Sequence, residues 1–138
     1  MNSCIFCHGI KSDDILISSK HFFAVLDIDP IQNGHIIIIS KKHYLDIRDI
    51  PENELLDLIN LEKKLITILE DNFNLLGVSV LQNNGKTMDQ GTHFHIHLVP
   101  RYSNDYFWEN HEVEKIQFDL DLLKRKLKTG SKNHCIRY

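Results

Sequence analysis

The sequence has few cysteines, no long apolar stretch and little net charge. Only Cys4, Cys7 and Cys135 are present, and this odd, small number argues against a disulfide framework. Apolar runs such as residues 36–39 are far too short to span a bilayer. A net charge of -3 gives no bulk attraction for nucleic acid or an anionic membrane, and the first residues, MNSCIFCHGIKSDD, lack the apolar region of a signal peptide. We therefore expect a reduced, cytoplasmic protein that binds neither nucleic acid nor membrane.

The length and composition indicate one globular domain. The chain has 138 residues, of which 42% are hydrophobic and 25% charged, an ordinary balance for a folded protein with a buried core. We place a single domain at residues 1–128 and a flexible tail at residues 129–138. No internal repeat or low-complexity segment interrupts this range.

Two neighbouring strands are predicted in the first third of the chain. HFFAVLDI (residues 21–28) is rich in aromatic and branched side chains, and HIIIIS (residues 35–40) is almost continuously apolar. The second strand is therefore expected to be covered on both faces. DPIQNG lies between them and marks a turn, so the two strands should form an antiparallel hairpin.

The remaining pattern predicts helix, strand, strand, helix. A helix should begin at Pro51 and end near residues 72–74. Its apolar side is formed by Leu55, Leu58, Ile59, Leu65, Ile66 and Leu69. Strands are expected at residues 77–83 and 92–100. A last helix should pack on the sheet through Val113, Ile116, Leu120, Leu123 and Leu127. This order describes an α+β domain with a mainly antiparallel sheet.

Three histidines occupy alternate positions in DQGTHFHIHLVPR (residues 89–101). Side chains of a strand alternate between its faces, so His93, His95 and His97 should share one face while Phe94 points toward the core. Such a row can bind a metal, bind a phosphate, or provide a nucleophile whose neighbours hold its tautomer. An exposed polar sheet face is the plain structural alternative, and the spacing alone does not choose among these.

A second pattern, CIFC, places Cys4 and Cys7 in the C-x2-C spacing of a zinc site. The competing interpretations are a thioredoxin-type redox pair, which belongs in a βαβ setting absent here, and two buried thiols. Zinc needs two further ligands. The candidates are His8, His21, His35, His43 and the alternating histidines.

Together these residues resemble the histidine triad (HIT) family, whose signature His-φ-His-φ-His-φ-φ matches HFHIHLV (residues 93–99). The matching segments, in the family's order, are CIFC, VLDIDP, GHIIIISKKHY, LQNNG and PRY. The resemblance covers about the first hundred residues and is to the Hint-like branch with an N-terminal C-x2-C. It implies an antiparallel sheet of about five strands with one long central helix and a C-terminal helix.

The resemblance also implies roles for individual residues. His95 would attack the α-phosphorus of a nucleotide and form a nucleotidyl-histidine that water hydrolyses. His97 and His35 would contact the phosphate. Asp27 would bind the ribose hydroxyls, although as a residue before Pro30 it also suits a turn. Two further nucleotide contacts are implied, from Ile28 to the base and from Asn83 to the sugar and phosphate.

Members with the C-x2-C pattern resemble the galactose-phosphate uridylyltransferase branch, which holds zinc beside the active strand. Carried onto this sequence, the zinc ligands are Cys4, Cys7, His43 and His93. Four protein ligands leave no open position, so the zinc would be structural and would help to orient the strand that carries the nucleophile. The three alternating histidines would then divide between metal, attack and phosphate.

One departure from the family pattern lies before the first histidine. The family has Gln-Ser/Thr-Val-x there, whereas this chain reads Asp89-Gln90-Gly91-Thr92, with the glutamine one residue closer. Gly91 would permit a bulge that restores the catalytic contact of Gln90.

The resemblance implies a homodimer that hydrolyses purine nucleoside phosphoramidates. The alternatives are a dinucleoside polyphosphate hydrolase, transfer to inorganic phosphate, and a nucleotide-binding regulator with little turnover. A metal-only protein, with all three triad histidines on zinc, is a further alternative.

Overall fold

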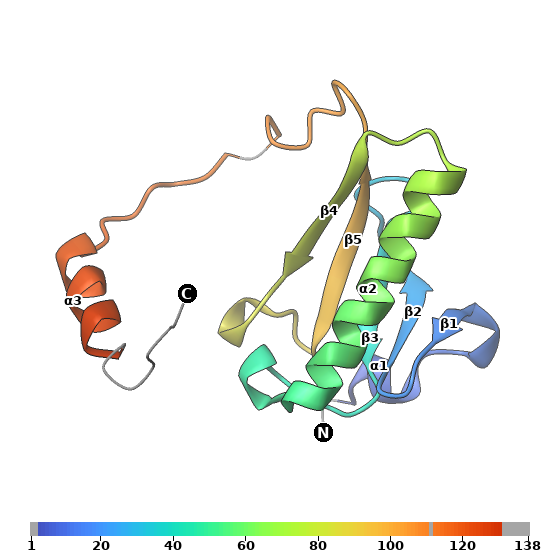
Figure 1. Cartoon of the computed structure of the whole chain (residues 1–138), viewed down its shortest axis with the longest axis horizontal. Helices are drawn as coiled ribbons and strands as arrows, with labels where there is room; N and C mark the ends of the chain where they lie inside the picture. The colour runs from blue at the N-terminus through green and yellow to red at the C-terminus, as the bar shows by residue number, and fades with distance from the viewer. Residues whose placement is uncertain (1–2, 111, 131–138) are drawn as a thin grey trace, which may run out of the picture. The chain divides into compact units, whose positions relative to one another are not determined.

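The computed structural model describes residues 3–110 and 112–130. Residues up to Asp105 form one compact unit, and residues from Tyr106 onward form a second. The first unit contains a sheet of five strands, coloured blue to orange in Figure 1. The strands are β1 (Ile15–Ser18), β2 (Phe22–Leu26), β3 (Ile36–Ser40), β4 (Gly77–Gln82) and β5 (His95–Arg101). All pairs are antiparallel in the order β1-β2-β3-β5-β4, so the predicted α+β class is confirmed.

The hairpin of β2 and β3 forms as predicted. Its strands pair in register from Phe22 opposite Ser40 to Leu26 opposite Ile36. The turn uses Gly34 at φ +82°, a left-handed conformation that glycine adopts without strain. Every residue of β3 is buried, which confirms that both faces of this strand are covered.

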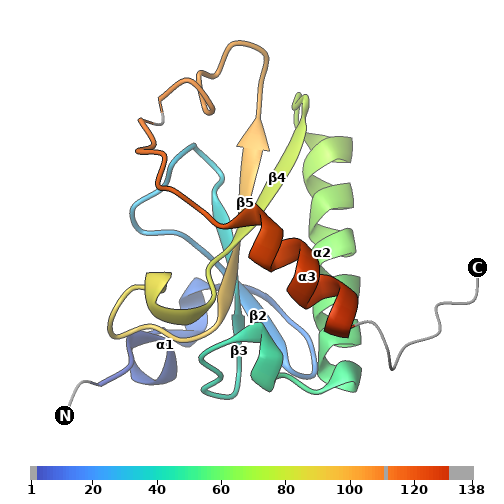
Figure 2. The ribbon, with the colours of Figure 1, turned by 90° about the vertical axis from the view of Figure 1, so that its left-hand side faces the viewer.

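The long helix α2 (Glu52–Asn72) covers one face of the sheet (Figures 1 and 2). Its buried side includes Leu58, Leu65 and Leu69 as predicted, and these pack with Phe22, Phe94 and their neighbours in the main core. Ile59, assigned to the same side, is 49% exposed, so that assignment is wrong. Leu61 is buried instead, because it continues the i, i+3 and i+4 spacing from Leu58 to Leu65.

The other face of the sheet carries a smaller apolar cluster. Phe23, Val25, Ile37 and Ile39 form it, and Phe6 and Ile10 of the N-terminal segment pack against it together with Ile15. The short helix α1 (Ile5–His8) lies on this side, opposite α2 (Figure 2). Neither α1 nor β1 was predicted, since four residues carry too little periodicity to identify an element.

The strand with the alternating histidines begins later than predicted. It starts at His95 rather than at residue 92, so His93 lies just before it. The backbone N–H of Phe94 donates to the Tyr44 carbonyl at 2.6 Å, a contact with a loop rather than with a strand. Pro100 lies inside β5 and does not stop it. β3 pairs with β5 only as far as Leu98. Beyond Leu98, the edge of β5 that faces away from β4 has no partner strand, so the missing N–H of Pro100 is tolerated there.

The second unit contains one helix, α3 (Leu120–Gly130). The prediction that Val113 and Ile116 belong to this helix is wrong, because the helix begins after Asp119, whose carboxylate accepts from the Leu122 N–H at 2.9 Å. The expected tail, residues 129–138, begins within α3, and residues 131–138 lie outside the described residues. No helix in the described part of the chain is long and apolar enough to cross a membrane.

Candidate active site and metal centre

His95 has one ring nitrogen fixed and the other free to react. It extends from β5 toward the sheet face opposite α2 and is only 7% exposed. Its Nδ1–H donates to the His93 carbonyl at 2.7 Å. Because a neutral imidazole carries one proton, Nε2 must hold a lone pair. No hydrogen bond to this Nε2 occurs within the described residues, so His95 has the tautomer that a nucleophile requires.

Phe6 packs on this histidine, a contact that was not predicted from the sequence. The ring of Phe6 meets His95 edge-on at a centroid distance of 5.0 Å and His93 at 5.5 Å. Its place between Cys4 and Cys7 is the only signal that could have identified it, because any residue there must lie beside the metal ligands. Phe6 therefore restricts the orientation of the His95 ring and excludes water from one side of it.

A hydrogen-bonded pair, His35 and His97, lies beside His95. The Ile31 backbone N–H donates to His35 Nδ1 at 3.0 Å, so the proton of neutral His35 must be on Nε2. His35 Nε2 lies 2.9 Å from His97 Nδ1 and donates to it. The remaining proton of His97 is consequently on Nε2. One backbone N–H thus fixes the tautomers of two histidines and leaves His97 with an N–H donor.

Both histidines of this pair are held in the neutral form. Burial lowers the pKa of His97 to about 4, and the neighbouring His95 and His35 add to this effect. Burial also lowers the pKa of His35, while Asp27 opposes the shift. At neutral pH the pair therefore carries no charge, and negative charge brought by a phosphate would favour protonation of His97.

The structure brings Asp27 to the same pair of histidines. Asp27 Oδ2 lies 3.5 Å from His35 Nε2 and 3.7 Å from His97 Nδ1, and Oδ1 accepts from the Asp29 N–H. Ile28, next in sequence, is 93% exposed and offers a bare apolar surface. Asn83 is also exposed, at the end of β4. Of the five residues assigned to a nucleotide, Asp27, His35 and His97 therefore lie close together, whereas Ile28 and Asn83 are exposed.

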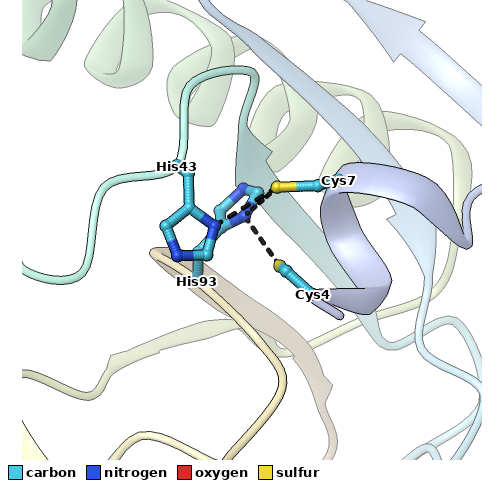
Figure 3. A group of neighbouring side chains, drawn as sticks. All are labelled: Cys4, Cys7, His43 and His93. Atoms are coloured by element: carbon cyan, nitrogen blue, oxygen red, sulfur yellow. Dashed lines mark hydrogen bonds between the residues drawn. The ribbon is translucent and has the colours of Figure 1, made fainter. Parts of the chain in front are cut away.

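The four expected metal ligands form a second group (Figure 3). Cys7 lies in α1 and Cys4 immediately precedes this helix, while His43 comes from the loop after β3 and His93 from the residues before β5. Cys4 Sγ lies 3.1 Å from His93 Nδ1, and Cys7 Sγ lies 3.2 Å from His43 Nδ1 and 3.5 Å from His93 Nδ1. All four ligand atoms lie within 4.8 Å of one another.

These four residues fit a tetrahedral zinc ion. Zinc–sulfur and zinc–nitrogen bonds of about 2.3 and 2.0 Å separate the two ligand atoms by about 3.5 Å at a tetrahedral angle. His93 is also prepared as a ligand, since its Nε2–H donates to the Ser40 carbonyl at 2.6 Å and leaves Nδ1 unprotonated toward the thiols. Burial lowers the pKa of His93, which favours this neutral form.

Asp27, His35 and His97 are also close enough to suggest a metal site, but their proton positions do not fit one. A metal would need the lone pair of His35 Nε2. That atom carries the proton, because the Ile31 N–H donates to Nδ1. Moving the proton would leave this N–H facing another N–H and cost about 1–3 kcal/mol. The first group is therefore a candidate metal site, and the second is a hydrogen-bonded site.

The loop before the triad is a turn rather than a bulge. Gly91 has φ +79°, and its carbonyl accepts from the Ile5 N–H at 2.8 Å, which joins this loop to α1. The Thr92 hydroxyl donates to the Asp89 carbonyl at 2.7 Å and is therefore engaged within the loop. Gln90 is exposed, and its side chain has no hydrogen-bond partner in the described residues. The expected contact of Gln90 with a substrate therefore stays a prediction.

Asp46 anchors the loop that follows β4, a role that the sequence did not suggest. Its buried carboxylate accepts from the Gly85 N–H at 3.0 Å and from the side chain and N–H of Arg48. These bonds, the Arg48 side chain foremost, keep the pKa of Asp46 well below its usual range. An aspartate three residues after a predicted metal ligand carries no local pattern from which this contact could be read.

Comparison with known proteins agrees with this geometry. The HIT domain model matches residues 9–104. An adenosine 5'-monophosphoramidase of Saccharomyces cerevisiae is 41% identical over 104 residues, which is 72% of this chain and 63% of the yeast protein. A bis(5'-adenosyl)-triphosphatase of Dictyostelium discoideum is 27% identical over 112 residues, covering 77% and 74% of the two chains.

A solved structure shows the same fold. The histidine triad nucleotide-binding protein of Candida albicans superimposes with a TM-score of 0.70 at 32% identity, covering 94% of this chain and 96% of that one. The matched domain contains the triad, the hairpin and the long helix described above. The chain therefore belongs to the histidine triad family.

Proposed function

We propose that this protein is a hydrolase that cleaves nucleotidyl compounds at the α-phosphate, with purine nucleoside phosphoramidates as the preferred class. The tautomer of His95 carries this proposal, because Nδ1–H is bonded to the His93 carbonyl and the lone pair of Nε2 is free. The relatives named as a monophosphoramidase and a triphosphatase both hydrolyse bonds to nucleotide phosphorus, as their names state, and so support the general class.

The reaction is proposed to proceed in two balanced steps. His95 Nε2 forms a bond to the α-phosphorus while the P–N bond breaks and its electron pair stays on the leaving nitrogen. That nitrogen takes the Nε2 proton of His97 and departs as an amine. One water then attacks the phosphorus of the nucleotidyl-histidine and gives one of its protons back to His97 Nε2. The bond to His95 breaks and the nucleotide is released.

The other predicted residues are proposed to bind the substrate. Asp27 would accept from the ribose hydroxyls, Ile28 would pack on the base, and Asn83 would contact the sugar and phosphate. Gln90 would contact the phosphate or the leaving group. His35 is proposed to act on the phosphate through His97, because both of its own nitrogens are engaged and it is only 2% exposed.

Zinc is proposed as a structural cofactor on Cys4, Cys7, His43 and His93. When bound, the ion would join the segment around α1 to His93, two residues before β5, and so help to hold the His93 carbonyl that orients His95. Four protein ligands leave it no position for substrate. A homodimer is likewise proposed from the family resemblance, and sedimentation equilibrium of the purified protein would test it. A cytoplasmic location is proposed from the composition of the chain.

The deciding experiment is AMP release from adenosine phosphoramidate and from diadenosine polyphosphates, with wild type and His95→Ala compared. Release that is lost in the variant would support His95-dependent chemistry. A preference for the phosphoramidate supports the main proposal, and a preference for the dinucleotides supports a dinucleoside polyphosphate hydrolase, the activity named for the Dictyostelium relative. Tight AMP binding with no release above the variant would instead identify a nucleotide-binding regulator.

A further inference from the structure

Cys4 and Cys7 meet at one atom but differ in their exposure to solvent. Cys4 Sγ lies 3.1 Å and Cys7 Sγ 3.5 Å from the same nitrogen, His93 Nδ1 (Figure 3). Cys4 is buried, at 8% exposure, whereas Cys7 is exposed. A small oxidant in solution can therefore reach Cys7 directly, and the sulfur of Cys4 lies within 4.8 Å of the sulfur it would oxidise.

The backbone around this pair suits a disulfide. The N–H groups of Cys7 and His8 both donate to the Cys4 carbonyl, at 3.2 and 3.3 Å, so the two cysteines share one helical turn. Residues three apart in such a turn are neighbours, with Cβ atoms about 5–6 Å apart. The same C-x2-C spacing closes to a disulfide in thioredoxin-type redox pairs. The two sulfur atoms must approach to about 2.05 Å, which requires movement within this turn and not in the sheet.

The proposed zinc ion would keep both sulfur atoms in their reactive form. A thiol that coordinates zinc is deprotonated, and the thiolate is the form that peroxide oxidises. Cys4 and Cys7 are also the two proposed ligands that supply negative charge. A disulfide between them would leave only His43 and His93, and two neutral imidazoles hold zinc far more weakly than four ligands do. Oxidation of the pair and release of the ion are therefore one event.

We propose that Cys4 and Cys7 are a site of reversible oxidation by hydrogen peroxide, which releases the zinc and lowers the hydrolase activity. The effect on activity rests on the proposed function. The Cys7 thiolate attacks one peroxide oxygen, the O–O bond breaks, and Cys7 becomes a sulfenic acid while hydroxide leaves. The Cys4 thiolate then attacks Cys7 Sγ, the disulfide forms and a second hydroxide leaves. The two sulfur atoms together lose two electrons, and peroxide with two protons becomes two molecules of water.

The disulfide would act on the triad through the residue between the two cysteines. Phe6 contacts the ring of His95 at a centroid distance of 5.0 Å and that of His93 at 5.5 Å. Drawing the two sulfur atoms together changes the turn that carries Phe6. Loss of the ion also removes one contact of His93, whose carbonyl orients His95. Because two supports of the His95 ring are disturbed together, we expect kcat to fall about 10-fold.

The test uses the zinc-loaded Cys135→Ser variant, in which Cys4 and Cys7 are the only cysteines. Hydrogen peroxide should release one zinc per chain, measured with a chromogenic chelator. The tryptic peptide of residues 1–11 should become lighter by about 2 Da, the mass of the two hydrogens lost when a disulfide forms. AMP release from adenosine phosphoramidate should fall about 10-fold in parallel. Dithiothreitol with added zinc should restore all three quantities.

A second variant tests the role of Cys4. Cys4→Ser in the same background has no thiol to attack the sulfenic acid of Cys7. Peroxide should therefore carry Cys7 on to a sulfinic acid, which adds about 32 Da to the peptide and is not reversed by dithiothreitol. Recovery of the Cys7 thiol with dithiothreitol in this variant would contradict the proposed step at Cys4.

The outcomes separate this inference from the proposed function. Zinc that stays bound during peroxide treatment, or irreversible oxidation of both cysteines, would overturn the oxidation site. Zinc release with unchanged AMP release would overturn its effect on the hydrolase. Absence of AMP release before any oxidation would overturn the proposed function, while zinc release and peptide mass would still decide the oxidation site.

Discussion

His35 illustrates how one backbone contact determines the chemistry of a side chain two steps away. The Ile31 N–H decides which nitrogen of His35 is protonated, and His35 in turn decides which nitrogen of His97 is protonated. His35 can therefore determine that His97 presents an N–H donor to the substrate, without touching the substrate itself. His35 is accordingly a positioning residue in the proposed reaction.

Replacing His35 by phenylalanine should lower kcat about 10- to 100-fold, because His97 then adopts either tautomer. The Ile31 N–H also loses its acceptor, and the loss of this partly buried hydrogen bond should reduce the free energy of unfolding by about 0.5–1.5 kcal/mol. Turnover of adenosine phosphoramidate and urea unfolding measure the two effects. A kcat equal to wild type, with only the stability reduced, would contradict the positioning role.

The proposed zinc site makes a prediction for single cysteines. Cys4→Ser and Cys7→Ser should each lose most of the bound zinc, because a hydroxyl is a poor ligand for this ion compared with a thiolate. Cys135→Ser replaces the cysteine that is not among the proposed ligands and should keep one zinc per chain. His95→Ala should also keep it.

Zinc content by atomic absorption decides between the arrangements. Loss of zinc in His95→Ala would indicate a site built from all three triad histidines and would contradict the proposed site of Cys4, Cys7, His43 and His93.

At the scale of the elements, helix α2 does more than cover the sheet. Glu54, in its first turn, is buried and accepts a hydrogen bond from the Tyr44 hydroxyl, and its other oxygen lies 3.0 Å from His21 Nδ1. The hydrogen bond to Glu54 raises the pKa of Tyr44 to about 12. Tyr44 follows His43, and its carbonyl accepts from Phe94. The helix thus holds the loop that carries a metal ligand.

Tyr44→Phe should reduce the free energy of unfolding by about 1–3 kcal/mol, because it removes a donor from a buried carboxylate. In a Glu54→Gln background the same change should cost less, and a double-mutant cycle in urea measures the difference. Tyr102→Phe is the matched control at a partly exposed position and should change stability by less than about 0.5 kcal/mol. Additive effects of the two substitutions would show that the pair is not coupled.

Most elements could be predicted from the sequence, while their exact limits could not. A clear pattern of apolar residues marks the hairpin of β2 and β3, the helix α2 and the strands β4 and β5. All of these elements form where they were predicted, apart from their exact ends. The start of β5 depends on the bond between Phe94 and Tyr44, fifty residues apart, which no local pattern encodes. The grouping of the four expected metal ligands followed from the family resemblance. The contacts of Phe6, Asp46 and Glu54 could not be predicted, because they depend on long-range packing.

For the whole molecule, the lowered pKa values predict how stability changes with pH. In the unfolded chain His97 has its ordinary pKa of 6.5, whereas in the folded chain the value is about 4. Between these values the unfolded state binds more protons, so stability rises with pH and is lost as the pH falls from 6.5 toward 4. His35, whose pKa is also lowered, acts in the same direction.

His97→Gln should therefore reduce the proton uptake on unfolding near pH 5 by about one. Urea unfolding of zinc-loaded wild type and variant from pH 4.5 to 7.5 gives the free energy of unfolding of each protein as a function of pH. The difference between the slopes of the two curves measures the change in proton uptake. The comparison cancels the acid sensitivity of the metal centre, which both proteins share. Parallel pH profiles would show that His97 keeps an ordinary pKa in the folded state.

The bond between Cys4 and His93 joins residues separated by 89 positions. Contacts of such high sequence separation form only after a large loss of chain entropy, and topologies that depend on them fold slowly. We therefore expect the face that carries His95 to be among the last parts of the sheet to become ordered during folding. A zinc ion held by both residues would tie the N-terminal segment to the strand that carries His95, so this segment should unfold together with the sheet.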